Sequence, residues 1–227
     1  MCFSATASFA AATVLIPAGL YSVRKSCQLD KSYWAFAMLP LLFGLQQLIE
    51  GRLWLALQDG RAGEVHYLAL GFILFSHVIW LGWVPFSAYL TEVSPKLKRT
   101  FLLVAVIGVL FGMSMYVPLL LNENWLAVSI VKHSIHYQPK FIFDVWVSQN
   151  LITVIYACIL LTPLILSTDP YHRMLGALVF LSGLVTGAFF EWAFVSVWCY
   201  FAAIVSLYIF FMIYRSVSVS QVPGSVS

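Results

Sequence analysis

The chain has 227 residues, of which 62% are hydrophobic and only 9% are charged. A soluble domain carries about 25% charged residues, so this composition excludes a water-soluble globular fold. The formal net charge of +3 is spread along the chain, without the basic stripe or aromatic-basic motif of nucleic-acid-binding proteins. We therefore expect a membrane protein whose main partner is the lipid bilayer, and no nucleic-acid partner.

A membrane-spanning helix needs about 20 mostly apolar residues. Seven segments predict an all-α bundle of about seven transmembrane helices in one domain, residues 1–215: 4–23, 33–57, 67–89, 100–121, 147–166, 174–191 and 197–214. The last two segments are so close that either a tight helical hairpin or a re-entrant turn fits them. The composition of residues 216–227 predicts a disordered tail, and residues 122–146 predict a loop that packs on the bundle as a lid.

The basic residues predict the orientation of the bundle. One side holds eight of them (Arg24, Lys25, Lys31, Lys96, Lys98, Arg99, Arg173, Arg215) and the other holds four (Arg52, Arg61, Lys132, Lys140). Because basic residues are enriched in cytoplasmic loops, we expect the N-terminus outside and the C-terminus in the cytoplasm. The predicted location is the bacterial cytoplasmic (inner) membrane.

Polar side chains inside these segments gather toward the outer side. An acidic residue at mid-helix costs about 3 kcal/mol, so each needs a reason. Glu50 is the strongest candidate because Gln46 and Gln47 share its helix face; the alternative is an interfacial carboxylate, or one paired with Arg52 or Arg61. The sequence predicts an outward-facing pocket lined by Gln46, Gln47, Glu50, His77, Asn150 and Glu191.

Histidines and cysteines leave several alternatives open. His77, near the middle of its segment, is either a neutral histidine bonded to a neighbouring helix or a proton-relay or metal-binding group. Cys2 and Cys199 are predicted on the outer side, as a disulfide, as idle thiols or as a reactive thiolate. A divalent metal would be the cofactor of a site built from Glu50, His77 and Glu191. His133 and His136 would hold a metal only with a third ligand.

Some sequence motifs carry a resemblance. The chain begins Met1-Cys-Phe-Ser-Ala-Thr-Ala-Ser-Phe9 and contains Gln46-Gln-Leu-Ile-Glu-Gly51 and Trp198-Cys-Tyr-Phe-Ala-Ala-Ile-Val-Ser206. It thereby resembles a family of small bacterial polytopic membrane proteins with no assigned function. This resemblance implies that Cys2, Glu50 and Cys199 lie in the family pattern, but implies no activity. The seven-helix lipid hydrolases that include alkaline ceramidases are similar in helix count, yet their late H-x-x-x-H is missing here.

Three functions are compatible with these residues. The favoured one is binding or transport of a cation, proton or small polar solute in the outer pocket. The second is a membrane-embedded enzyme acting on a lipid or lipid-linked substrate, with Cys2 or Cys199 as nucleophile or a bound metal. The third is an accessory subunit of a larger membrane complex, or of an oligomer.

Overall fold

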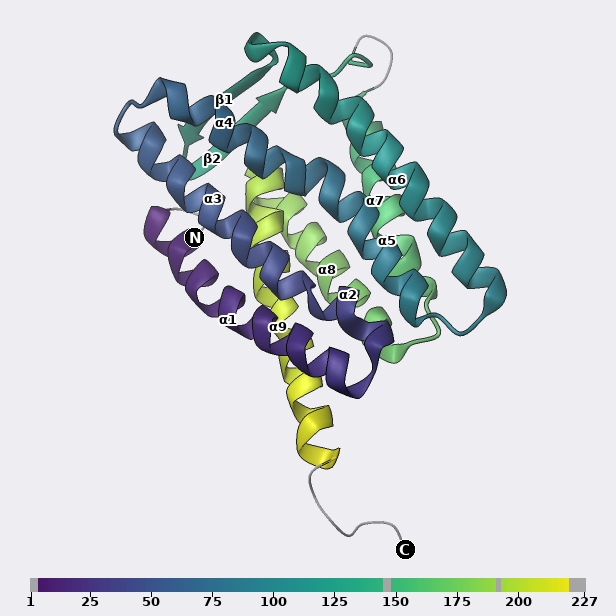
Figure 1. Ribbon diagram of the computed structural model, residues 1–227. Helices are drawn as coiled ribbons and strands as arrows, with labels where there is room; N and C mark the ends of the chain where they lie inside the picture. The colour runs from purple at the N-terminus through teal and green to yellow at the C-terminus, as the bar shows by residue number, and fades with distance from the viewer. Residues whose placement is uncertain (1–3, 145–147, 191–192, 221–227) are drawn as a thin grey trace, which may run out of the picture.

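The computed structural model describes residues 4–144, 148–190 and 193–220. These residues form a bundle of long antiparallel helices with one small β-hairpin at one end (Figure 1). Six helices are long and apolar enough to cross a membrane, and a seventh apolar helix, at Asn150–Leu166, is shorter. This result supports the predicted helical membrane fold, while the orientation of the termini stays a prediction.

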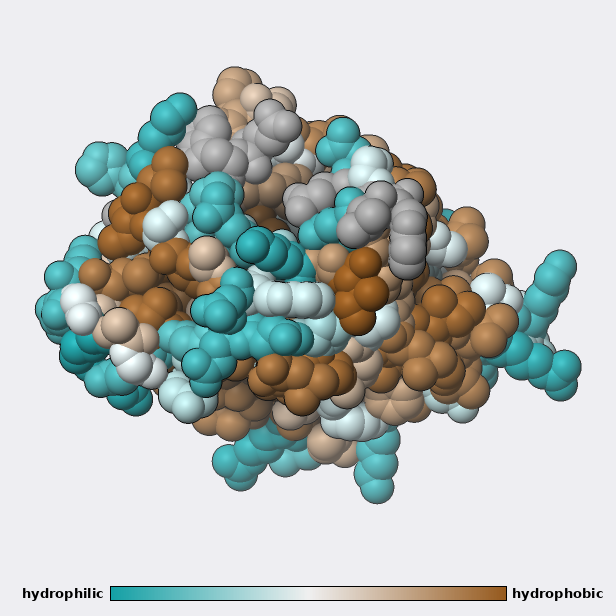
Figure 2. Space-filling view, turned by 90° about the horizontal axis from the view of Figure 1, so that it is seen from above, coloured by the Kyte–Doolittle hydropathy of each residue, from teal (hydrophilic) through white to brown (hydrophobic). Residues whose placement is uncertain are grey.

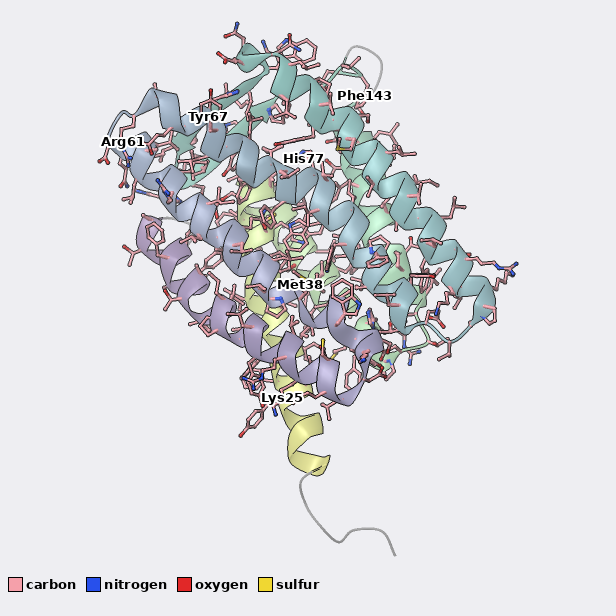
Figure 3. All side chains as sticks on the ribbon, in the orientation of Figure 1. Lys25, Met38, Arg61, Tyr67, His77 and Phe143 are labelled. Atoms are coloured by element: carbon pink, nitrogen blue, oxygen red, sulfur yellow. The ribbon has the colours of Figure 1, made fainter. Side chains whose placement is uncertain are left out.

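The chain first runs along the bundle three times, and we call each run a passage. The first passage is α1 (Ala5–Leu29). The second consists of η1 (Lys31–Tyr33), α2 (Trp34–Ala37) and α3 (Leu39–Gln58), and the third of α4 (Ala62–Ile73), η2 (Leu74–Ile79) and α5 (Trp80–Thr91). The remaining helices are α6 (Pro95–Leu121), α7 (Gln149–Leu166), α8 (Pro170–Phe189) and α9 (Phe194–Ser220). Between α6 and α7 lie η3 (Glu123–Trp125), β1 (Leu126–Val131) and β2 (Ser134–Pro139). We call the end with β1 and β2 the hairpin end, and the other the opposite end. Arg61 lies at the hairpin end and Lys25 near the opposite end (Figure 3).

Three features of the structure bear on the predicted segments. Helix α9 continues through Ser220 and extends past the other helices (Figure 1), while the disordered tail predicted for residues 216–227 stays a prediction. The last two segments form separate long helices, α8 and α9, which supports the tight hairpin over the re-entrant turn. The all-α prediction also missed the two-stranded sheet of β1 and β2.

Close contact between backbones packs α6 against the third passage. Gly108 and Gly112 are four residues apart and so share one face of α6. A Cβ added at Gly108 would lie 2.1 Å from the carbonyl oxygen of Leu81, and one at Gly112 would lie 2.2 Å from that of His77. Small residues at this spacing let membrane helices approach closely, so these glycines fix the position of η2 and α5.

The third passage contains a wide π-helical stretch, η2, which includes Ser76 and His77. π-Helical stretches are rare in proteins, but those that occur are often found at functional sites. The hydroxyl of Tyr156 on α7 donates to the backbone oxygen of Ser76. This contact, together with Gly112, holds the stretch between α6 and α7.

The hairpin packs on the bundle. Its strands pair antiparallel from Leu126 opposite Pro139 to Val131 opposite Ser134. Ile135 is fully buried, and the ring of Tyr137 stacks on Phe72 of α4 with the centroids 4.7 Å apart. Residues 126–139 therefore cover the hairpin end, in the place predicted for a lid.

The turn of the hairpin gives a first prediction. Lys132 and His133 have φ values of 47° and 59°, in the left-handed region that favours glycine. We expect His133→Gly to stabilise the hairpin by about 1 kcal/mol, since it removes the steric cost of the side chain. Hydrogen exchange of the hairpin amides measures the effect, with His133→Ala as the control that keeps a Cβ. Equal protection in both variants would contradict the prediction.

Candidate functional site

A cavity of about 510 Å³ lies beneath the hairpin, at the meeting point of η2, α6, β2, α7, the end of α8 and the start of α9. Hydrophilic side chains gather over part of the hairpin end and hydrophobic ones along its flanks (Figure 2). The polar or titratable residues that line the cavity are Ser76, His77, His136, Tyr137, Asn150, Thr153, Tyr156, Ser196 and Cys199. The cavity therefore combines side chains from segments far apart in the sequence.

Glu50 on α3 does not itself line the cavity, but it is hydrogen-bonded to Ser196, which does. Its side chain is fully buried. Ser196, which lines the cavity, donates from Oγ to Glu50 Oε1 at 2.6 Å, and Gln47 donates from Nε2 to Glu50 Oε2 at 3.1 Å. The ion pairs within the described ranges join Arg61 to Asp59 and Glu64, and His172 to Asp169. The alternative of an interfacial carboxylate is thus wrong, and no cation pairs with Glu50 among these residues.

The two glutamines beside Glu50 are also fully buried. Gln46 Oε1 accepts a hydrogen bond of 3.1 Å from the indole nitrogen of Trp80. Gln46 Nε2 and Gln47 Oε1 have no hydrogen-bond partner among the described residues. Because a buried polar atom without a partner costs about 1–3 kcal/mol, such atoms are usually completed by water or a ligand. Both amides are buried next to Glu50, behind the residues that line the cavity.

His77 and Cys199 also face the cavity. His77 Nδ1 lies 2.8 Å from the hydroxyl of Ser76 on its own helix, and its ring centroid lies 5.7 Å from that of Phe141. The hydrogen-bond partner of His77 is thus on its own helical segment. The alternative of a histidine bonded to a neighbouring helix had placed this partner elsewhere. Cys199 on α9 is a buried, free cysteine close to Glu50 and Gln46.

The other candidate residues divide into three groups. Asn150 and His136 line the cavity. His133 lies at the hairpin turn and is exposed. Cys2 and Glu191 lie outside the described residues, so their predicted roles stay predictions. Within 4–144, 148–190 and 193–220, no three His, Cys, Asp or Glu residues come together as a metal site.

The comparisons with known proteins concern the whole chain. The model of a family of unknown function, DUF6629, matches residues 1–223. The chain belongs to this family. The search of curated proteins found no match, and neither did the search of solved structures. Membership of DUF6629 agrees with the resemblance to an uncharacterised family, and the matched region contains every residue of the cavity.

Tyr156 is among the cavity residues of this DUF6629 chain that were not predicted from the sequence. Tyr156 lines the cavity and donates to the backbone of η2. It lies on α7 three residues after Thr153, which lies three residues after Asn150, so each consecutive pair is adjacent on the helix surface. This spacing of polar side chains was the signal that could have found it.

At the opposite end, Glu92 connects the α5–α6 loop to the α7–α8 loop through hydrogen bonds. It is 3% exposed and follows α5 directly. Its carboxylate accepts hydrogen bonds from the backbone nitrogens of Val93, Ser94 and Thr168 and from the hydroxyls of Ser167 and Thr168. Burial alone would raise the pKa of Glu92, but these hydrogen bonds outweigh it and hold the pKa below the ordinary value. Glu92 thus joins the α5–α6 loop to the α7–α8 loop as an ionised group.

Asp169 makes a second connection at the same end. It accepts hydrogen bonds from the Tyr33 hydroxyl at 2.8 Å and from the backbone nitrogen of Tyr171 at 2.9 Å, and it lies 2.9 Å from His172 Nδ1. Burial raises the pKa of Asp169, but the contacts with His172, Tyr171 and Tyr33 lower it by more. The net pKa is therefore below the ordinary value. The opposite end is therefore closed by ionised carboxylates bonded to their neighbours.

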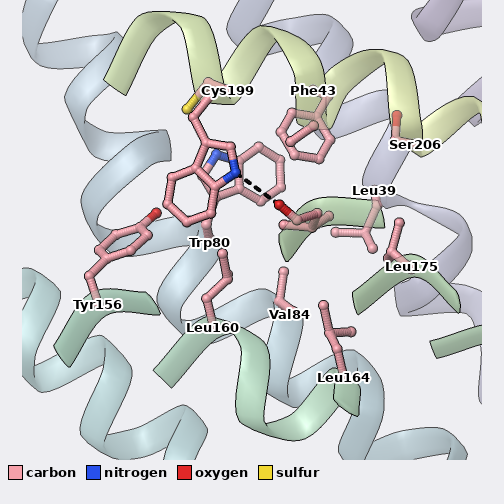
Figure 4. A pocket seen from close by; sticks show the side chains of 13 residues that line it. Leu39, Phe43, Trp80, Val84, Tyr156, Leu160, Leu164, Leu175, Cys199 and Ser206 are labelled. Carbon is pink, nitrogen blue, oxygen red and sulfur yellow. Dashed lines mark hydrogen bonds between the residues drawn. The ribbon is translucent and has the colours of Figure 1, made fainter. Parts of the chain in front are cut away.

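A second, small chamber of about 40 Å³ lies next to the large cavity (Figure 4). Its walls are almost wholly apolar, and both spaces share Tyr156, Trp198 and Cys199. The indole nitrogen of Trp198 donates to the backbone oxygen of Val179 at 3.2 Å, the bond drawn in Figure 4. Leu164 and Leu175 also line the chamber, which lies between the large cavity and the loops around Asp169.

Proposed function

We propose that this protein is a multi-pass protein of the bacterial inner membrane that binds, and carries across the membrane, a small polar solute, a cation or a proton. In this proposal the hairpin end faces outward and the 510 Å³ cavity receives the ligand. The observation that carries the proposal is Glu50, a fully buried carboxylate bonded to the neutral partners Ser196 and Gln47.

The energetic argument concerns the charge of Glu50. An isolated buried carboxylate costs several kcal/mol unless it is compensated. Neutral hydrogen bonds from Ser196 and Gln47 supply part of this compensation. A proton or a bound cation supplies the rest, since no ion pair of the described residues reaches Glu50. Ionisable groups of this kind inside a membrane mark ion and proton pathways.

The arrangement of the two spaces supports transport over simple binding. The large cavity lies at the hairpin end, and the dry chamber next to it leads toward the opposite end. The bulky ring of Trp198 lines both spaces. Hydrophobic constrictions of this kind gate membrane pathways by excluding water. We infer that the structure is the outward-facing, closed state of such a pathway.

The substitution Glu50→Gln tests the proposal, because it keeps the size of the side chain and removes its charge. We expect at least tenfold weaker binding or slower flux for one member of a panel of protons, Na⁺, K⁺, an organic ammonium and small polar solutes in liposomes. Ser22→Ala is the control: Ser22 is equally buried but bonds only to its own helix, at Ala18 O. Unchanged binding and flux for every panel member in Glu50→Gln would reject the proposal.

A second candidate function is that of a membrane-embedded enzyme acting on a lipid or lipid-linked substrate. The observation that favours it is the presence of Cys199 and His77 in the wall of one cavity, since a thiol and an imidazole are the groups of nucleophilic catalysis. The two functions separate in Cys199→Ser. An enzyme that uses this thiol loses turnover and keeps substrate binding, whereas a transporter keeps its flux.

A further inference from the structure

The walls of the large cavity restrict the chemistry of its ligand. Among the described lining residues, none is a lysine, arginine, aspartate or glutamate. Five of them carry aromatic rings other than histidine: Tyr137, Phe141, Tyr156, Phe194 and Trp198. Pockets of about 300–1,000 Å³ with mostly apolar and aromatic walls and a few polar groups hold organic molecules of moderate size.

A bare inorganic ion does not fit these walls. Hard cations need several oxygen ligands at about 2.0–2.6 Å, and the described lining residues offer no carboxylate. No metal-binding group of three residues occurs within the described ranges. The volume of about 510 Å³ is also far larger than one ion needs.

The charge next to the cavity determines the sign of the ligand. When Glu50 is ionised, one negative charge lies behind Ser196, and no arginine or lysine pairs with it in the described parts of the chain. An anion would therefore be repelled, whereas a monocation would neutralise the site. Aromatic rings attract cations as well, by about 0.5–2 kcal/mol for each favourable contact.

Resting on the cavity function proposed above, we propose that the ligand is an organic monocation with an apolar body, such as a quaternary or protonated tertiary amine. The charged nitrogen lies toward Ser196 and Glu50, and the apolar body lies against the aromatic rings of α7, α9 and the hairpin side. Gln47, which is fully buried, donates to Glu50 Oε2 and so fixes the carboxylate behind Ser196.

A matched pair of probes tests this inference without altering the protein. The first is benzyldimethyl(2-hydroxyethyl)ammonium, and the second is its neutral isostere with carbon in place of nitrogen. Calorimetry in a non-ionic maltoside detergent measures the affinity of both. We expect the ammonium to bind at least tenfold more tightly than the isostere. Equal affinities, or binding of the isostere alone, would overturn the inference and indicate a neutral solute.

Two variants assign most of the difference to Glu50. Glu50→Gln should remove most of the preference for the ammonium over the isostere, since only the aromatic rings then favour the cation. Glu64→Gln, which removes an exposed carboxylate bonded to Arg61, should leave both affinities unchanged. Retention of ammonium selectivity in a folded Glu50→Gln protein would also overturn the inference. If protons or Na⁺ depend on Glu50 while the ammonium does not bind, the inference fails and the proposed function stands.

Discussion

Substitution of Gly112, like that of Gly108, should damage the fold severely. We expect Gly112→Ala to lower the free energy of unfolding by about 1–3 kcal/mol, and Gly112→Leu to abolish the folded state. The reason is that a Cβ at this position would lie 2.2 Å from the carbonyl oxygen of His77 and 3.0 Å from the Cα of Val78. Backbone atoms cannot move aside as the end of a side chain can. SDS unfolding in mixed micelles measures the loss.

Gly63 is the matched control for this prediction. It is also helical, in α4, but a Cβ there would meet nothing within 4 Å. We expect Gly63→Ala to leave stability unchanged or to raise it by up to about 1 kcal/mol, because alanine is the better helix former. Equal effects at Gly63 and Gly112 would show that the loss at Gly112 does not come from the contact with η2.

Removal of the Glu92 carboxylate should have the second-largest effect. Glu92→Ala leaves the backbone nitrogens of Val93, Ser94 and Thr168 and the hydroxyls of Ser167 and Thr168 without their acceptor. Hydrogen bonds to a charged group contribute about 1.5–3 kcal/mol each, and water replaces some of them in a loop. We expect a loss of about 3 kcal/mol in SDS unfolding. Glu64→Ala, at an exposed carboxylate in a surface ion pair with Arg61, should cost less than about 1 kcal/mol.

The acid dependence of stability provides a second measurement on Glu92. Its pKa is lower in the folded state than the ordinary value. Such a group stabilises the fold above its unfolded pKa, and the contribution is lost as the pH falls through the folded pKa. Wild-type protein should therefore lose stability more steeply than Glu92→Gln as the medium is acidified below the unfolded pKa. Parallel acid titrations of the two proteins would contradict this role.

The sequence was most informative where helical periodicity and burial act together. Gln46, Gln47 and Glu50 were predicted to share one face, and all three are fully buried. Their burial has a physical reason, because a polar face in an apolar helix must be covered by protein. Their predicted role in a pocket stays a prediction, since none of the three lines the cavity. The same reasoning could not identify Ser196 as the partner of Glu50, since contacts between residues 146 positions apart depend on how the helices pack.

The features that were not predicted occur in segments whose local sequence resembles an ordinary loop or an ordinary apolar helix. Glu92 and Asp169 occur among ordinary loop residues, and only the meeting of two loops buries them. The π-helical stretch at Leu74–Ile79 has the composition of any apolar helix. The hairpin strand Leu126–Val131 is too short to be distinguished from an interfacial helix by its apolar residues. In each case the tertiary structure supplies the information that the local sequence lacks.

The small apolar chamber has an electrical consequence for a protein that spans a bilayer. In the pathway proposed above, a solvent-filled cavity would conduct ions far better than hydrocarbon, so the membrane voltage would fall mainly between the cavity and the opposite end, where the apolar chamber lies. One elementary charge that crosses the full voltage changes in energy by about 2.3 kcal/mol per 100 mV. On that proposal, a charge moving from the Glu50 region past Trp198 would be coupled to a large share of the membrane potential.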